Sequence, residues 1–187
     1  MVITLSGRRI DPVNAAVVRF PLEHSAMVRE RIRAIMQEHQ ATALVSSAAC
    51  GTDLLALSIA GELGIRRRIV LPFPPERFRA SSVVDRPGEW EELFDQIIKE
   101  VEAAGDLVIL NEEREGNTAY LHTNQATIDE AQRLARQAAR DTGSAVSSAI
   151  LAIIVWEGQP RGTDDITAAF ASEARARSIP IVEVLTR

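Results

Sequence analysis

The sequence predicts an α/β fold, namely one three-layer domain with a mostly parallel sheet of about five or six strands and helices on both faces. Short apolar runs alternate with segments of helical periodicity along the chain, which is the order of a sheet whose strands are joined by crossover helices. The 187 residues are 46% hydrophobic and 25% charged, as expected for one globular domain with a substantial core. We therefore treat residues 1–187 as a single domain.

The first half of the chain contains three predicted strands, each followed by a helix. The strands cover residues 2–6, 42–46 and 68–72, and the helices cover residues 23–40, 51–63 and 89–103. In the first helix, Met27, Ile32 and Met36 fall on one face at helical spacing. Gly64 and Gly105 each follow a helical pattern and fit helix ends.

The second half continues the alternation. Strands are predicted at residues 106–110, 150–156 and 180–184, and helices at residues 119–141 and 164–178. Two polar segments, 72–88 and 111–118, do not fit the pattern, and both follow predicted strands. Loops after the strands of an open parallel sheet gather at its carboxyl edge, where ligands bind.

A loop of small residues joins the second strand to its helix, reading Ser46-Ser47-Ala48-Ala49-Cys50-Gly51-Thr52-Asp53. A helix that begins in such a loop presents free amide groups, which form a seat for phosphate or another anion. Small side chains let a ligand approach the main chain. The alternative for Gly51 and Asp53 is an ordinary helix start, where an acidic residue complements the helix dipole.

Polar residues also follow the first, third and fifth strands. These segments are Ser6-Gly7-Arg8-Arg9-Ile10-Asp11, Pro72-Phe73-Pro74-Pro75-Glu76-Arg77-Phe78 with Ser81-Ser82, and Trp156-Glu157-Gly158-Gln159-Pro160-Arg161-Gly162-Thr163-Asp164. If the strands are parallel, these segments and the small-residue loop share one edge of the sheet. We therefore expect a ligand site there.

Composition limits the classes of function. The formal charge of −5 gives no broad basic field, which disfavours nucleic acid as a partner. Cys50 is the only cysteine, and His24, His39 and His122 have no partner at metal-binding spacing, so we expect no disulfide, no metal site and no cofactor. The chain enters an apolar strand at Val2 without a signal peptide, and its longest apolar run, residues 149–156, is too short to span a membrane. We expect a cytoplasmic protein.

Taken in order along the chain, these segments resemble the SLOG superfamily, a Rossmann-like group that includes the Lonely-guy (LOG) nucleotide phosphoribohydrolases and DprA-type proteins. The resemblance is nearest to SLOG domains associated with bacterial signalling and defence modules. The matching segments are Ser6–Asp11, Ser46–Asp53, Leu71-Pro72-Phe73 with Arg77-Phe78, Ser81-Ser82-Val83, Trp90 with Phe94, and Trp156-Glu157-Gly158 with Gly162-Thr163.

The resemblance implies a pocket for a nucleotide or nucleotide-derived ligand. By that match Gly51 would approach a phosphate, and Gly162 and Thr163 would form a second anion seat at the start of the last long helix. The candidate ligand-binding residues are Gly7, Arg8, Arg9, Ser46, Ser47, Ala48, Cys50, Gly51, Asp53, Arg77, Ser81, Tyr120, Asn124, Trp156, Glu157, Gly158, Gly162 and Thr163.

Several candidates have a structural alternative. Cys50 is either a reactive thiol at a helix start or a small packing residue. Of Arg8 and Arg9 we expect about one to face the site. Trp156 either stacks on a base or packs in the core. Arg66-Arg67-Arg68 precedes a strand at the opposite edge and is interpreted as a solvated face or a local partner patch.

The chain also departs from the hydrolase pattern. LOG enzymes carry Pro-Gly-Gly-x-Gly-Thr-x-x-Glu, whereas this chain reads Gln159-Pro160-Arg161-Gly162-Thr163-Asp164-Asp165-Ile166. Ile166 stands at the position of the glutamate and cannot transfer a proton. The carboxylates that could substitute are Asp53, Glu76, Glu157 and Asp164.

The leading hypothesis is accordingly a module that binds or senses a nucleotide-derived small molecule. The alternative is a LOG-like N-glycosidic hydrolase acting on a nucleoside monophosphate. Single-stranded DNA binding is disfavoured, because aromatic residues make up only 4% of an acidic chain. As a partner besides the small molecule we expect a second copy of the chain in a homodimer.

Overall fold

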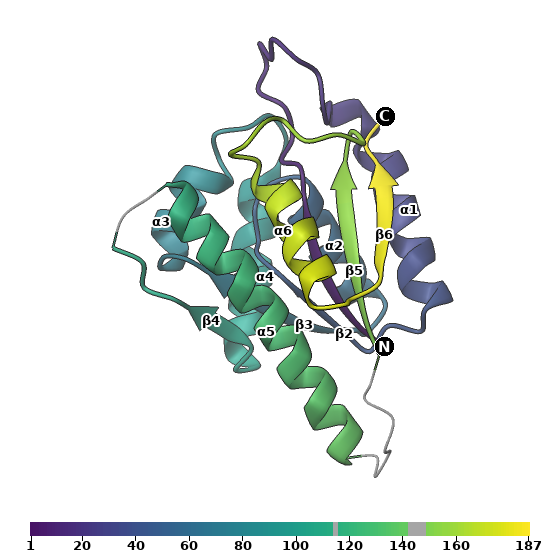
Figure 1. The fold of residues 1–187 in the computed structure, drawn as a ribbon. Coiled ribbons are helices and arrows are strands. Elements are labelled where there is room, and N and C mark those ends of the chain that lie inside the picture. Colours follow the sequence, from purple (N-terminus) through teal and green to yellow (C-terminus); the bar gives the residue numbers. More distant parts are fainter. Residues whose placement is uncertain (114–115, 142–148) are drawn as a thin grey trace.

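The computed structural model describes residues 1–113, 116–141 and 149–187 and confirms the predicted fold class (Figure 1). All six strands are parallel and lie in the order β4-β3-β2-β1-β5-β6. Their bounds are β1 Val2–Gly7, β2 Ala43–Ser46, β3 Arg66–Leu71, β4 Leu107–Ile109, β5 Ile150–Trp156 and β6 Ile181–Leu185. The architecture is a Rossmann-like three-layer domain.

Helices cover both faces of the sheet (Figure 1). The helices α1 Ser25–Glu38, α2 Thr52–Glu62 and α4 Trp90–Ala103 pack on one face, and α5 Asn117–Asp141 and α6 Ile166–Ala176 pack on the other. A short 3-10 helix, η1 Leu22–His24, precedes α1, and a short helix, α3 Pro75–Ser82, follows β3. No helix in the described ranges is both long and apolar enough to cross a bilayer.

The most buried elements are those that the layers enclose on both sides. Strand β5 has the run Leu151 to Trp156 buried, because a central parallel strand is covered on both faces and needs apolar residues at successive positions. Helix α2 is apolar on nearly all sides, because it packs against the sheet, α1 and α4. Their ends at the carboxyl edge of the sheet position the loops that follow β5 and precede α2.

The chain reverses its direction of travel between β1 and β5. From β1 it moves outward through β2 and β3 to β4, and then α5 crosses back to place β5 beside β1. In open α/β sheets such a reversal leaves a crevice beyond the carboxyl ends of the two strands, and ligands bind there. Gly7 and Trp156 therefore end the strands that border the expected crevice.

Several expected boundaries differ from the structure. Strand β3 begins at Arg66 rather than Arg68, and the arginines at its start are not simply solvated, because Arg66 and Arg68 both bond Asp106, at 2.7 and 2.9 Å. The segment 72–88 contains α3, with a proline at its first turn, where the missing N–H is no loss. Of the polar segment 111–118, residues 114–115 lie outside the described ranges.

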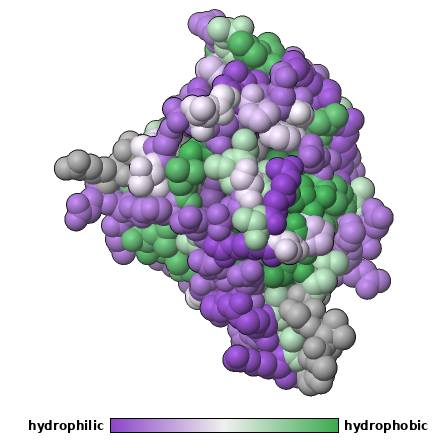
Figure 2. All heavy atoms as spheres, viewed as in Figure 1, coloured by the Kyte–Doolittle hydropathy of each residue, from purple (hydrophilic) through white to green (hydrophobic). Residues whose placement is uncertain are grey.

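The outer surface of the α5 and α6 layer is shown in Figure 2. Helix α5 presents a mostly hydrophilic surface, and hydrophobic side chains gather at the top of the molecule over the loop that joins β1 to η1. The exposed valines of that loop are Val13, Val17 and Val18. The same loop forms part of the wall of the cavity described next.

Candidate functional site

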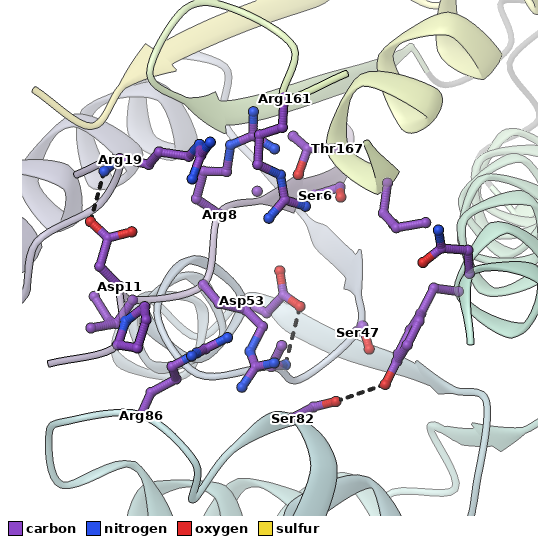
Figure 3. Close-up of a pocket in the computed structure, with 18 of the residues that line it drawn as sticks. Ser6, Arg8, Asp11, Arg19, Ser47, Asp53, Ser82, Arg86, Arg161 and Thr167 are labelled. Carbon is purple, nitrogen blue, oxygen red and sulfur yellow. Dashed lines mark hydrogen bonds between the residues drawn. The ribbon is translucent and has the colours of Figure 1, made fainter. Parts of the chain in front are cut away.

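A cavity of about 680 Å³ lies at the carboxyl edge of the sheet (Figure 3). The segments that follow β1, β2, β3 and β5 all contribute to its wall, as does the start of α5, which confirms that these loops meet. The wall consists of Ser6, Gly7, Arg8, Arg9, Ile10, Asp11, Pro12, Ala15, Ala16, Val17, Arg19, Ser47, Ala49, Asp53, Phe78, Ser82, Arg86, Asn117, Tyr120, Thr123, Asn124, Arg161, Ile166 and Thr167.

The predicted phosphate seat at the start of α2 is occupied by the protein's own main chain. Gly51 has φ +89°, and a Cβ placed on it would lie 2.8 Å from the backbone nitrogen of Ile10. The amide of Thr52 donates to the carbonyl of Arg8, and the amide of Cys50 donates to the carbonyl of Ser82. Gly51 is therefore required for the close approach of the β1 loop, and it does not line the cavity.

Most of the small residues before Gly51 are also turned away from the cavity. Ser46, Ala48 and Cys50 are buried and absent from its wall. Burial raises the pKa of the Cys50 thiol, which makes the unreactive packing role the one that the structure supports. Within residues 46–51, Ser47, a predicted ligand-binding residue, and Ala49, which was not predicted, reach the cavity.

Asp53 lies in the first turn of α2 and points into the cavity (Figure 3). Its Oδ2 accepts a hydrogen bond from the amide of Ala49 at 3.1 Å. Burial raises the pKa of its carboxyl to about 7, against the opposing effects of that amide and of the Arg9 charge. Perturbed carboxyl groups in cavities are candidates for proton transfer.

Arg8 lines the cavity, but its guanidinium is already bound by carboxylates of the protein. Its guanidinium donates to both carboxylate oxygens of Asp165, at 2.6 and 2.8 Å, and its Nε donates to Glu157 at 2.5 Å. The three side chains are 2%, 0% and 3% exposed for Arg8, Asp165 and Glu157. The second oxygen of Glu157 binds the Nε of Arg19 at 3.0 Å. Glu157 thus joins β5 to the loop after β1 and does not line the cavity.

The second predicted anion seat is likewise filled from within the protein. Helix α6 begins at Ile166, and the carboxylate of Asp165 caps it by accepting from the amides of Thr167 and Ala168. Although burial opposes its ionisation, hydrogen bonds from Arg8 and from backbone amides lower the pKa of Asp165 to about 2. Gly162, Thr163 and Asp164 are exposed and lie outside the cavity wall.

Four arginines other than Arg8 line the cavity, namely Arg9, Arg19, Arg86 and Arg161. They come from the loops after β1, β3 and β5. The Nε–H groups of Arg9 and Arg86 are buried and have no hydrogen-bond acceptor among the described residues. Burial and the neighbouring charges of Arg8 and Arg19 lower the pKa of Arg161. Each of the four also forms an ion pair, Arg9 and Arg86 with Asp85, Arg19 with Glu157 and Arg161 with Asp165. The cavity therefore brings together four cations that share three carboxylates.

Another part of the wall consists of neutral polar groups. Tyr120 and Asn124 line it as predicted. The Tyr120 hydroxyl lies 3.2 Å from that of Ser82, and the Asn124 amide donates to the carbonyl of Ile166 at 2.8 Å. Ser82 lies in the wall where Ser81 was predicted.

The remaining candidates lie elsewhere. Trp156 packs in the core with Phe170, and its indole N–H donates to Glu183, so it is not free to stack on a base. Arg77 lies over the ring of Phe73, and neither Arg77 nor Gly158 lines the cavity. Glu76 borders a separate shallow hollow between α3 and α4.

The sequence analysis missed several residues of the wall. Asp11 and Arg161 stand in the polar segments that follow β1 and β5. Their position in loops after strands could have marked them as candidates for ligand binding. Arg86 stands in the polar segment 72–88, which also follows a predicted strand. Arg19 lies far from any strand end, and nothing in the sequence distinguishes it from a surface arginine. Asp11 fixes this region by accepting from the amides of Arg19 and Phe20 at 2.7 and 2.8 Å.

Comparison with known proteins adds no family to this geometry. No family model and no curated protein matches the chain.

Proposed function

We propose that the cavity binds a phosphorylated small molecule derived from a nucleotide. The observation that carries the proposal is the convergence of Arg9, Arg19, Arg86 and Arg161 on one cavity in a chain of net charge −5. Guanidinium groups are the side chains best suited to phosphate oxygens. The cavity volume of about 680 Å³ lies within the range of small-molecule sites.

The neutral wall supports a ligand with a second, uncharged part. Ser82, Tyr120 and Asn124 offer hydroxyl and amide groups of the kind that recognise a sugar or a base edge. The resemblance to SLOG domains is consistent with such a ligand, and membership of that superfamily is part of the proposal. A shared fold alone does not establish a function, whereas the residues of the cavity wall are specific to this chain.

Isothermal titration calorimetry with AMP, ADP, cyclic AMP and NAD⁺ tests the proposal. We expect at least one to bind, with affinity that falls as salt is raised. Arg161→Met should weaken binding, since its side chain is 44% exposed and its ion pair with Asp165 is long, at 3.8 Å. Arg136→Met removes an exposed arginine outside the cavity and is the matched control.

Two results would count against the proposal. One is the absence of binding by every member of the panel. The other is equal loss of affinity in Arg161→Met and Arg136→Met, which would show that the effect is one of net charge and not of the cavity.

N-glycosidic hydrolysis of a nucleoside monophosphate is the second candidate, and one observation favours it. Of the carboxylates considered as substitutes for the missing glutamate, only Asp53 lines the cavity, and its pKa of about 7 suits a proton donor near neutral pH. Release of free base from AMP, lost in Asp53→Asn and retained in Asp164→Asn, would support hydrolysis. Unchanged turnover in Asp53→Asn would exclude Asp53 as the proton donor.

A further inference from the structure

Asp53 is a buried carboxyl group among the arginines of the cavity, and it forms no ion pair with any residue that the structure describes. Its side chain belongs to a residue that is 7% exposed. Ala49 donates to Oδ2, and no donor among the described residues contacts Oδ1. Figure 3 shows the carboxyl pointing into the cavity, between Arg161 on one side and Arg86 on the other. One carboxyl oxygen therefore remains for a ligand.

The surroundings of Asp53 can be stated element by element. The charged and titratable groups on the cavity wall around it are Arg8, Arg9, Asp11 and Arg19 from the loop after β1, Arg86 from the loop after α3, Tyr120 from α5 and Arg161 from the loop after β5. Cys50 lies just before α2 and is buried. The arginines keep their charge at all working pH values, so Asp53 is the group here whose charge changes near neutrality, consistent with its pKa of about 7.

We propose that the cavity takes up its anion together with one proton, which is carried by the Asp53 carboxyl. The inference rests on the proposed function. An ionised Asp53 would repel a phosphate and compete with it for the guanidinium groups, whereas a protonated Asp53 can donate its O–H to a phosphate oxygen. The proton comes from solvent and converts the carboxylate to the carboxyl form, and no other bond is made or broken.

The proton linkage has a predictable size. If only the protonated form binds, the apparent affinity is reduced by the fraction of the protein in that form. With a pKa of about 7, this fraction falls roughly tenfold between pH 6 and pH 8. Asp53→Asn removes the charge while its side-chain oxygen can still accept from the Ala49 amide. It should therefore bind roughly tenfold more tightly than the wild type at pH 8 and about equally at pH 6.

The first experiment needs no ligand. Carboxyl ¹³C NMR of the free protein, with Asp53→Asn used for assignment, should show Asp53 titrating near pH 7. A midpoint near pH 4, the usual value for aspartate, would overturn the inference whatever the protein binds.

The second experiment measures proton uptake on binding. AMP is titrated into wild type, Asp53→Asn and the exposed control Asp164→Asn at pH 7, in PIPES and in imidazole buffers, whose ionisation enthalpies differ. The wild type and Asp164→Asn should take up more protons than Asp53→Asn. Protons that AMP itself takes up contribute equally to all three titrations, so they drop out when the proton uptakes of the variants are compared.

The outcomes separate the two proposals. Binding of AMP with equal proton uptake in all three proteins overturns this inference and leaves the proposed function standing. If AMP does not bind, ADP, cyclic AMP and NAD⁺ are titrated in the same way. Failure of all four overturns both.

Discussion

Replacing Arg8 by methionine tests whether this arginine holds the fold together or serves the ligand. Methionine keeps a long apolar stem but removes the guanidinium that bonds Asp165 and Glu157. Both carboxylates would then be buried without a cation directly between them. The substitution should therefore destabilise the protein even when no ligand is present.

The magnitude follows from the burial of the three groups. All three side chains are at most 3% exposed, and removing one partner of a buried ion pair costs about 3–5 kcal/mol. The Asp165 pKa, which Arg8 and the amides of Arg161 and Ala168 lower together, gives a second and smaller value. Its reduction from 3.8 to about 2 corresponds to ~2 kcal/mol of stabilisation at neutral pH. This contribution is present above pH 3.8 and is lost as pH falls through about 2.

Urea unfolding at pH 7, followed by circular dichroism, measures the effect directly. We expect Arg8→Met to lower the free energy of unfolding by about 3–5 kcal/mol. The difference from wild type should narrow by ~1 kcal/mol at pH 3, where Asp165 is mostly protonated in the unfolded chain but still mostly ionised in the folded wild type. Arg9→Met is the matched control. Its pair with Asp85 has side chains 28% and 39% exposed, so the expected loss is about 1 kcal/mol or less.

The reasoning would be refuted if Arg8→Met stayed within about 1 kcal/mol of the wild type at pH 7. It would also be refuted if Arg9→Met were the more damaging substitution. Either result would return Arg8 to the role that the sequence suggested, as a residue held ready for an anion.

Three further predictions concern the segment around α2. Because the pKa of Asp53 is raised above its unfolded value of 3.8 to about 7, the free energy of unfolding should decline as pH rises between these values. Asp53→Asn should remove the decline and be more stable than the wild type by up to ~4 kcal/mol at pH 8, measured by urea unfolding across this pH range. Gly51→Ala should lower the free energy of unfolding by more than about 2 kcal/mol, and Gly64→Ala should lower it by less. Both glycines have positive φ, but only at Gly51 would the added Cβ clash with a backbone atom. Cys50, whose thiol is buried with a raised pKa, should react with iodoacetamide much faster in urea than in the native protein; equal rates would contradict its placement.

The fold could be predicted because its signal is local. A strand such as β5 is a continuous apolar run, and each helix carries its own periodicity, so both can be recognised without knowledge of their neighbours. Once the strands are taken as parallel, the meeting of their following loops at one edge is a consequence of topology. The location of the cavity was therefore implied by the order of the elements.

The roles of single residues in the cavity could not be predicted in the same way. Arg8 and Arg9 are adjacent in the sequence, yet Arg8 bonds Asp165, 157 positions away, and Arg9 bonds Asp85. The chain gives no sign of either pairing. Gly51 illustrates a different difficulty. A glycine before a helix is required equally when a phosphate approaches the main chain and when another loop does, and here the other loop is that of Arg8 to Ile10.

Arg8 also contributes to the proposed site indirectly, because its two carboxylate partners contact Arg19 and Arg161. Glu157 joins Arg8 to Arg19, and Asp165 joins Arg8 to the amide of Arg161 at 2.7 Å. A long side chain that is already held loses less conformational freedom on binding than one that moves freely in solvent. The buried ion pairs thus reduce the entropic cost of placing cations around an anion, and the two carboxylates that offset part of the cavity's positive charge also fix its geometry.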